Sequence, residues 1–211
     1  MEGADHGPFP PGRGRVIQLL FGVNGRHQHS WYVAPQPADR DPGGAHKKGW
    51  PTALRRWIES YDVFKTNRSH TFVARQGPVN LMQRFTDDCD IAVTGSFAAV
   101  RLAPVAAPAM LVAYARDVET TATAFGLLPA DRGANVVLLR PFDEVVWERT
   151  MVAEAICYVS PSQVAADCLT GNGRMPSEGE ALVTWMVENQ AEWRTPSVKD
   201  VTPVEESRDG S

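Results

Sequence analysis

A strand-to-helix turn with a Gly-Ser pair is the part of this sequence best suited to chemistry. The apolar residues 91–94 run into Gly95, and a short helix is predicted at residues 96–102. A turn of this kind exposes backbone N–H groups at a helix N-terminus, where the helix dipole favours anions. The sequence therefore predicts a functional turn at Thr94, Gly95 and Ser96.

The carboxylates that would make this turn catalytic are missing. Nucleotidyltransferases with Gly-Ser at such a turn need an Asp-x-Asp or Asp-x-Glu pair about ten residues further on, because two metal ions are held against a triphosphate. The next strand, residues 109–114, contains no acid, and the first carboxylate after it is Asp117. The adjacent acids at 87–88 and 143–144 do not replace the pair, because neighbouring side chains on a strand point to opposite faces. We therefore expect an enzyme-like scaffold without catalytic ligands, metal site or cofactor.

Two reactive groups are candidates near the turn. Ser96 could act as a nucleophile, but no histidine follows it in the sequence, so we expect it to cap the helix. Asp167 lies among apolar residues of a predicted helix, and Arg174 follows across a glycine-rich turn. We expect Asp167 and Arg174 to form a structural ion pair or cap, which is also a candidate site if it lies near the Thr94–Ser96 turn.

Charge is unevenly distributed along the chain. The net charge is −4, but residues 1–88 carry +4 and residues 89–211 carry −8. The basic half is the better candidate for contact with nucleic acid, and a merely solvated basic face is an equally weighted alternative. The candidate nucleic-acid contacts are Lys47, Lys48, Arg55, Arg56, Arg68 and Arg75.

Composition argues against a membrane-spanning or disulfide-rich protein. The apolar stretches are far shorter than the roughly 20 residues that a spanning helix needs, and the first residues lack a signal-peptide pattern. Cys89, Cys157 and Cys168 are odd in number and irregularly spaced, which is typical of neither a disulfide framework nor a zinc site. We therefore expect a cytoplasmic protein whose cysteines are reduced and mostly buried.

Gly- and Pro-rich stretches and the spacing of apolar residues divide the chain into four segments. Residues 1–49 are rich in Gly and Pro and are predicted to form a flexible or degenerate arm. Residues 50–89 predict a connector made of a helix, a hairpin around Asn67 and a second helix from Pro78. Residues 90–193 alternate strand and helix, as in a mixed α/β domain, and residues 194–211 predict a disordered tail.

Within the α/β segment the individual elements can be placed. The predicted strands are 91–94, 109–114, 135–139 and 156–159, and the predicted helices are 96–102 and 118–125. Capping boxes that begin at Ser160 and Ser177 predict two more helices, the first of them at 161–169.

Four segments together resemble the AbiEi family, in particular its actinobacterial branch. They are residues 57–61 (WIESY), 93–99 (VTGSFAA), 135–142 (NVVLLRPF) and 159–185, which begins VSPSQVAADCLTGNGRM. The resemblance covers about residues 50–193 and rests on several ordered motifs. It implies an antitoxin and transcriptional regulator of a type IV toxin–antitoxin system, with a nucleotidyltransferase toxin as functional partner and operator DNA as ligand. Direct contact with the toxin is not implied.

The N-terminus departs from this family. Its members usually begin with a winged helix-turn-helix, whereas residues 1–50 show no pair of helices joined by a short turn. Operator binding is therefore expected to be weak or lost. Two other functions stay open: a nucleotidyltransferase-like enzyme, and an interaction module that has lost DNA binding.

Overall fold

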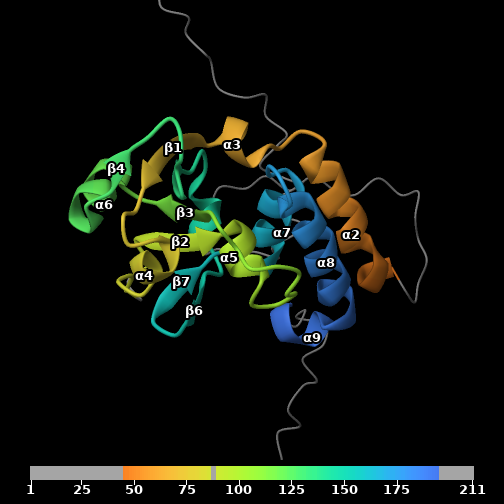
Figure 1. Ribbon diagram of the computed structural model, residues 1–211. Helices are drawn as coiled ribbons and strands as arrows, with labels where there is room; N and C mark the ends of the chain where they lie inside the picture. The colour runs from red at the N-terminus through yellow and green to blue at the C-terminus, as the bar shows by residue number, and fades with distance from the viewer. Residues whose placement is uncertain (1–44, 87–88, 195–211) are drawn as a thin grey trace, which may run out of the picture.

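The computed structural model describes residues 45–86 and 89–194, with side chains from residue 49 onward. It shows a mixed α/β fold, as predicted, in which a seven-stranded sheet is flanked by helices (Figure 1). The predicted C-terminal tail lies almost entirely outside the described residues, and so does most of the predicted arm. The described part of that arm, residues 45–49, belongs to the first helix.

The sheet is mixed and has the order β4-β1-β5-β3-β2-β7-β6. Strand β3 runs parallel to β5, and β2 runs parallel to β7, while the other neighbours are antiparallel. The strands are β1 (Arg68–Val73), β2 (Ile91–Thr94), β3 (Leu111–Ala115), β4 (Leu128–Pro129), β5 (Val136–Arg140), β6 (Met151–Ala153) and β7 (Ile156–Tyr158). All five residues of β3 are buried, as expected of an apolar central strand that is covered on both faces.

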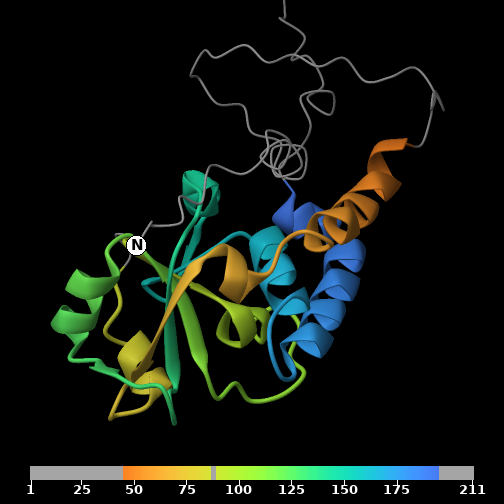
Figure 2. The same cartoon turned by 90° about the horizontal axis from the view of Figure 1, so that it is seen from above.

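The longer helices gather on one side of the sheet (Figure 2). Helices α7 and α8 pack together, α5 contacts both, and α2 packs on α7. None of the helices between residues 45 and 194 is long and apolar enough to cross a membrane. The helices are α2 (Ala45–Ile58), α3 (Val63–Thr66), α4 (Pro78–Met82), α5 (Gly95–Ala99), α6 (Val118–Phe125), α7 (Pro161–Leu169), α8 (Met175–Glu188) and α9 (Gln190–Trp193), with a 3-10 turn η1 (Glu144–Trp147).

Two predicted helices have the predicted bounds because their caps form. The Ser160 hydroxyl accepts a hydrogen bond from the backbone N–H of Gln163 at the start of α7. The Asp117 carboxylate accepts from the N–H of Thr120 at the start of α6, and Gly126 ends that helix with a left-handed backbone.

Two other local predictions are wrong. Helix α8 begins at Met175, before the predicted box, and the Ser177 hydroxyl donates to the carbonyl of Arg174. The first strand of the predicted hairpin is helix α3 instead, because the Asp62 carboxylate caps it by accepting from two backbone N–H groups. The second strand of that hairpin is β1, which lies between β4 and β5 in the main sheet.

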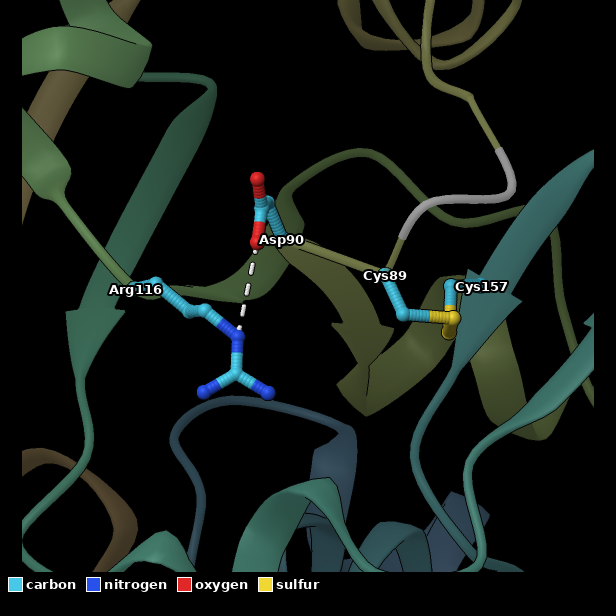
Figure 3. Close-up of a disulfide and its surroundings, with 4 residues drawn as sticks. All are labelled: Cys89, Asp90, Arg116 and Cys157. Atoms are coloured by element: carbon cyan, nitrogen blue, oxygen red, sulfur yellow. Dashed lines mark ion pairs between the residues drawn. A yellow bond between two sulfur atoms is a disulfide. The ribbon is translucent and has the colours of Figure 1, made fainter.

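The prediction of three reduced cysteines is wrong for two of them. Cys89, just before β2, forms a disulfide with Cys157 on β7, 68 residues away in sequence (Figure 3). The bridge is possible because β2 and β7 are neighbours in the sheet, which the cysteine spacing alone could not show. Cys168 is free and buried, as expected. Beside the bridge, Asp90 and Arg116 form an ion pair at 3.4 Å.

Candidate functional site

The predicted functional turn is buried under the helices. Gly95 has a φ of +63°, and a Cβ atom there would lie 3.2 Å from Met175 Cε and 3.3 Å from Val112 Cβ. Thr94 is fully buried and Ser96 is 8% exposed. The turn is therefore packed between β3 and α8, and the two hydroxyl groups next to Gly95 point to different carboxylates.

The first carboxylate, Asp167 on α7, is fully buried in a cluster of polar side chains. Its two oxygens accept hydrogen bonds from Thr94 Oγ1 at 2.6 Å and Tyr61 Oη at 2.6 Å. Gln163 Nε2 donates at 2.8 Å, and Tyr114 Oη lies 3.1 Å from both oxygens. We call Asp167, Tyr61, Thr94, Tyr114 and Gln163 the Asp167 cluster.

The cluster shifts the acid–base properties of its members. Burial raises the pKa of Asp167 to about 6, and the hydrogen bonds from Thr94 and Tyr61 oppose that rise because they favour the ionised form. Burial, together with the nearby Asp167 carboxylate, also raises the pKa of Tyr61 and Tyr114 well above the usual value for a phenol. Both tyrosines therefore act as neutral hydrogen-bond donors around the carboxylate.

The second carboxylate, Glu178 on α8, lies at the other end of the turn. Ser96 Oγ donates to Glu178 Oε2, and Glu178 Oε1 lies 3.3 Å from Arg174 Nε. That distance allows ion pairing, but Oε1 lacks a well-aligned hydrogen bond within the described residues. The carboxylate is 4% exposed and the Arg174 side chain 47%, so the cation faces outward. We call Ser96, Glu178 and Arg174 the Glu178 corner.

Two predictions about these side chains are wrong. Asp167 does not pair with Arg174: its partners are the neutral donors of its cluster, and the ion pair of Arg174 is with Glu178. Ser96 does not cap α5, because the N-cap residue is Thr94 and the Ser96 hydroxyl donates to Glu178 instead. Asp167 does lie next to the turn, through its contact with Thr94.

A cavity of about 470 Å³ opens beside the Glu178 corner. Ser69 and Thr71 of β1 and Val137 of β5 form part of its wall. Ser96, in the first turn of α5, and Arg174, the residue before α8, also line it. The Glu178 corner thus reaches an open space, whereas the Asp167 cluster does not line it.

The candidate nucleic-acid residues whose side chains the structure describes lie on helix α2 and around the two ends of strand β1. Arg55 on α2 pairs with Glu180 on α8, which raises the pKa of the arginine through their hydrogen bond. Arg56 is exposed on α2, whereas Arg68 and Arg75 are exposed at and beyond opposite ends of β1. Helix α2 and strand β1 lie apart in both views (Figures 1 and 2). The side chains of Lys47 and Lys48 lie outside the described residues.

Sequence reasoning missed most partners of the two carboxylates. Tyr61 lies at the end of the helix predicted at the start of residues 50–89, and Gln163 and Glu178 lie within the two predicted capping segments, so none of them stands out as a partner of a buried carboxylate. Tyr114 stands in a strand that reads as apolar. One sequence feature could have pointed to Tyr61 and Tyr114: each has a polar side chain at a position that the hydrophobic pattern predicts to be buried. A buried polar side chain needs a hydrogen-bond partner.

The described residues contain no group of three or more His, Cys, Asp or Glu side chains that could hold a metal ion. Comparison of the chain with protein-family models, curated proteins and solved structures gave no match.

Proposed function

We propose that this chain is a non-enzymatic antitoxin and transcriptional regulator of a type IV toxin–antitoxin operon, of the AbiEi family that its sequence resembles. The observation that supports this proposal is that the segments carrying the resemblance meet in space. Tyr61, Thr94 and Asp167 come from three of them, and the first and last are 106 residues apart, yet all three belong to the Asp167 cluster. The fourth segment contains β5 and Phe142, whose ring lies 6.4 Å from that of Tyr61.

The non-enzymatic part of the proposal rests on how the carboxylates near the turn are engaged. Asp167 accepts hydrogen bonds from four side chains, and Glu178 faces Ser96 and Arg174. Strand β3, where a nucleotidyltransferase would carry its acidic pair, has Tyr114 as its only polar side chain. Two-metal catalysis needs carboxylate oxygens that are free to bind cations. Both oxygens of Asp167 and one of Glu178 accept hydrogen bonds from the chain itself, and the other oxygen of Glu178 lies 3.3 Å from Arg174 Nε.

The proposed place of action is the cytoplasm, and the proposed functional partner is a nucleotidyltransferase toxin encoded beside this protein. Thiols are kept reduced in the cytoplasm of most organisms, so the Cys89–Cys157 bridge would be open to reduction there. A second candidate function is an interaction module without DNA binding. The separation of helix α2 from strand β1, the elements around which the described candidate arginines lie, favours it, because phosphate contacts need basic side chains on a common surface.

The decisive experiment is co-expression with the neighbouring nucleotidyltransferase toxin in a bacterial host. Growth restored by this chain, and equally by its Ser96→Ala variant, is the expected result. Failure of the folded chain to restore growth contradicts the antitoxin proposal. Loss of rescue in Ser96→Ala, together with metal-dependent transfer of labelled nucleotide by the purified chain, contradicts its non-enzymatic part.

DNA binding is tested separately by gel shift on the protein's own promoter and on a scrambled duplex. We expect weak binding with little sequence preference that falls by about tenfold between 50 and 200 mM salt if about two phosphates are neutralised. Comparison of Arg56→Ala, on helix α2, with Arg68→Ala, at the start of strand β1, shows which of these two elements contacts phosphate. Tight promoter-specific binding at physiological salt contradicts the expectation.

A further inference from the structure

The cavity beside the Glu178 corner has the size and lining of a small-molecule site. Its volume of about 470 Å³ lies within the range of pockets that hold small ligands. Apolar side chains form much of the wall, including Phe64, Val137 and Met175. Met110, at 41% exposed, adds an apolar surface that solvent can reach. A ligand for this space therefore needs an apolar body.

Three polar side chains of the cavity can donate or accept hydrogen bonds and have no partner among the described residues, and a fourth, Arg174, can only donate. The Asn172 amide and the hydroxyls of Ser69 and Thr71 make no hydrogen bond to another described residue. Arg174 donates from Nη2 to the carbonyl of Ala107 and pairs through Nε with Glu178, which leaves Nη1 without a partner among the described residues.

The charge that a ligand meets in the cavity is positive. Arg174 lines the cavity and is 47% exposed, whereas its partner Glu178 is 4% exposed and does not line it. Ser96 stands between the cavity and one carboxylate oxygen, because its hydroxyl donates to Glu178 Oε2. The guanidinium is therefore accessible, and the carboxylate behind it is shielded.

We propose that this cavity binds a small amphipathic carboxylate, with its aliphatic or aromatic body between Phe64, Val137 and Met175. The carboxylate lies against Arg174 and Asn172, since a guanidinium forms charge-assisted hydrogen bonds with a carboxylate and the amide N–H adds a neutral donor. The proposal does not depend on the antitoxin function, because binding is measured on the purified chain alone.

The test uses three fluorinated probes with the same aromatic body: 4-(trifluoromethyl)phenylacetate, its neutral primary amide, and 4-(trifluoromethyl)phenethylamine. Ligand-observed ¹⁹F NMR measures their affinity for the full chain. We expect the carboxylate to bind at least about tenfold more tightly than the amide, as one charge-assisted hydrogen bond implies, and the amine to bind weakest.

The alternation of side chains along β1 supplies two blocking variants and a matched control. Ser69 and Thr71 line the cavity, whereas His70 between them points to the opposite face of the sheet. Ser69→Trp and Thr71→Trp should fill the cavity and reduce carboxylate binding by at least about tenfold, and His70→Trp should leave it unchanged. All three positions are exposed, so the variants should fold, and circular dichroism checks this.

Three outcomes would overturn the proposal. The first is no carboxylate binding at millimolar concentration. The second is binding that Ser69→Trp and Thr71→Trp leave intact, which would place the probe elsewhere on the protein. The third is equal affinity for all three probes, blocked by both tryptophans, which would show an apolar pocket without anion selectivity.

Discussion

The two carboxylates near the β2–α5 turn have different surroundings, although Thr94 and Ser96, which contact them, are only two residues apart. Asp167 is sealed in the core and is held by neutral donors from α7, β2, β3 and the chain after α2. Glu178 faces a single hydroxyl and a half-exposed arginine beside a cavity. A hydroxyl in this turn can therefore either hold a core carboxylate in place or contact a carboxylate beside a cavity. The burial of the two carboxylates distinguishes these roles, and the sequence pattern of the turn does not.

The difference in burial indicates which candidate residues stabilise the fold and which can bind a ligand. A sealed polar cluster fixes one packing arrangement, because each of its members loses a partner if the core shifts. A corner at a cavity can exchange its partners for water or a ligand at lower cost. We therefore assign the Asp167 cluster to the architecture and the Glu178 corner to binding, and the following experiments test that division.

Asp167→Ala should have the largest effect on stability. It removes the acceptor for the hydroxyls of Tyr61 and Thr94 and for the amide of Gln163, and water cannot reach them. Each buried donor left without a partner costs about 1–3 kcal/mol, so we expect the free energy of unfolding to fall by about 4 kcal/mol in urea titrations. A loss below about 1 kcal/mol would show that the cluster is not a structural unit.

The next largest effect concerns pH. The pKa of Asp167 is about 6 in the folded chain against 3.8 for an unperturbed Asp, so the folded state holds the proton more tightly. Protonation of Asp167 therefore stabilises the folded state, and this stabilisation is fully present below about pH 4 and is lost as the pH rises through 6. It amounts to about 3 kcal/mol.

Asp167→Asn isolates this contribution, because the variant keeps every other titratable group. We expect the stability of the wild type relative to Asp167→Asn to fall by about 3 kcal/mol between pH 3 and pH 7 in urea titrations. Two parallel pH profiles would mean that Asp167 is hydrated in the folded protein.

Gly95→Ala tests whether the turn that joins the two sites is fixed by packing. The left-handed φ of +63° costs an L-residue about 1 kcal/mol, and the crowding by Met175 and Val112 adds to this. We expect a loss of about 2–3 kcal/mol. Gly126→Ala is the matched control, since its φ is +65° but nothing lies within 4 Å of its Cβ position, and it should lose only about 1 kcal/mol. Equal losses would show that packing at Gly95 is loose.

The sequence predicted the fold better than the site, for a physical reason. Local signals such as the Ser160 and Asp117 caps and the apolar periodicity act within a few residues, and they located α7, α6 and the core strands. Contacts between distant segments were not accessible in this way. The Cys89–Cys157 bridge and the contact between Tyr61 and Asp167 depend on strand order and helix docking.

The same limit explains the wrong partner for Arg174. Asp167 and Glu178 are both acids at short sequence separation from it, and spacing alone did not decide between them. Glu178 is four residues further along, on the first turn of α8, where an i, i+4 pair is brought together. The glycine turn after α7 carries Arg174 away from Asp167 instead.

The smallest expected effects come from the two hydroxyls on either side of Gly95, and they compare the two sites most directly. Thr94→Val removes a donor to Asp167 while keeping the shape of the side chain, and no water can replace it, so we expect a loss of about 2 kcal/mol. Ser96→Ala removes a donor to Glu178, but Ser96 lines the cavity, so water can take over the hydrogen bond and the loss should be about 1 kcal/mol or less. Urea titrations of both variants at pH 7 measure the difference. If Ser96→Ala costs as much as Thr94→Val, water does not reach Glu178, and the Glu178 corner is as structural as the Asp167 cluster.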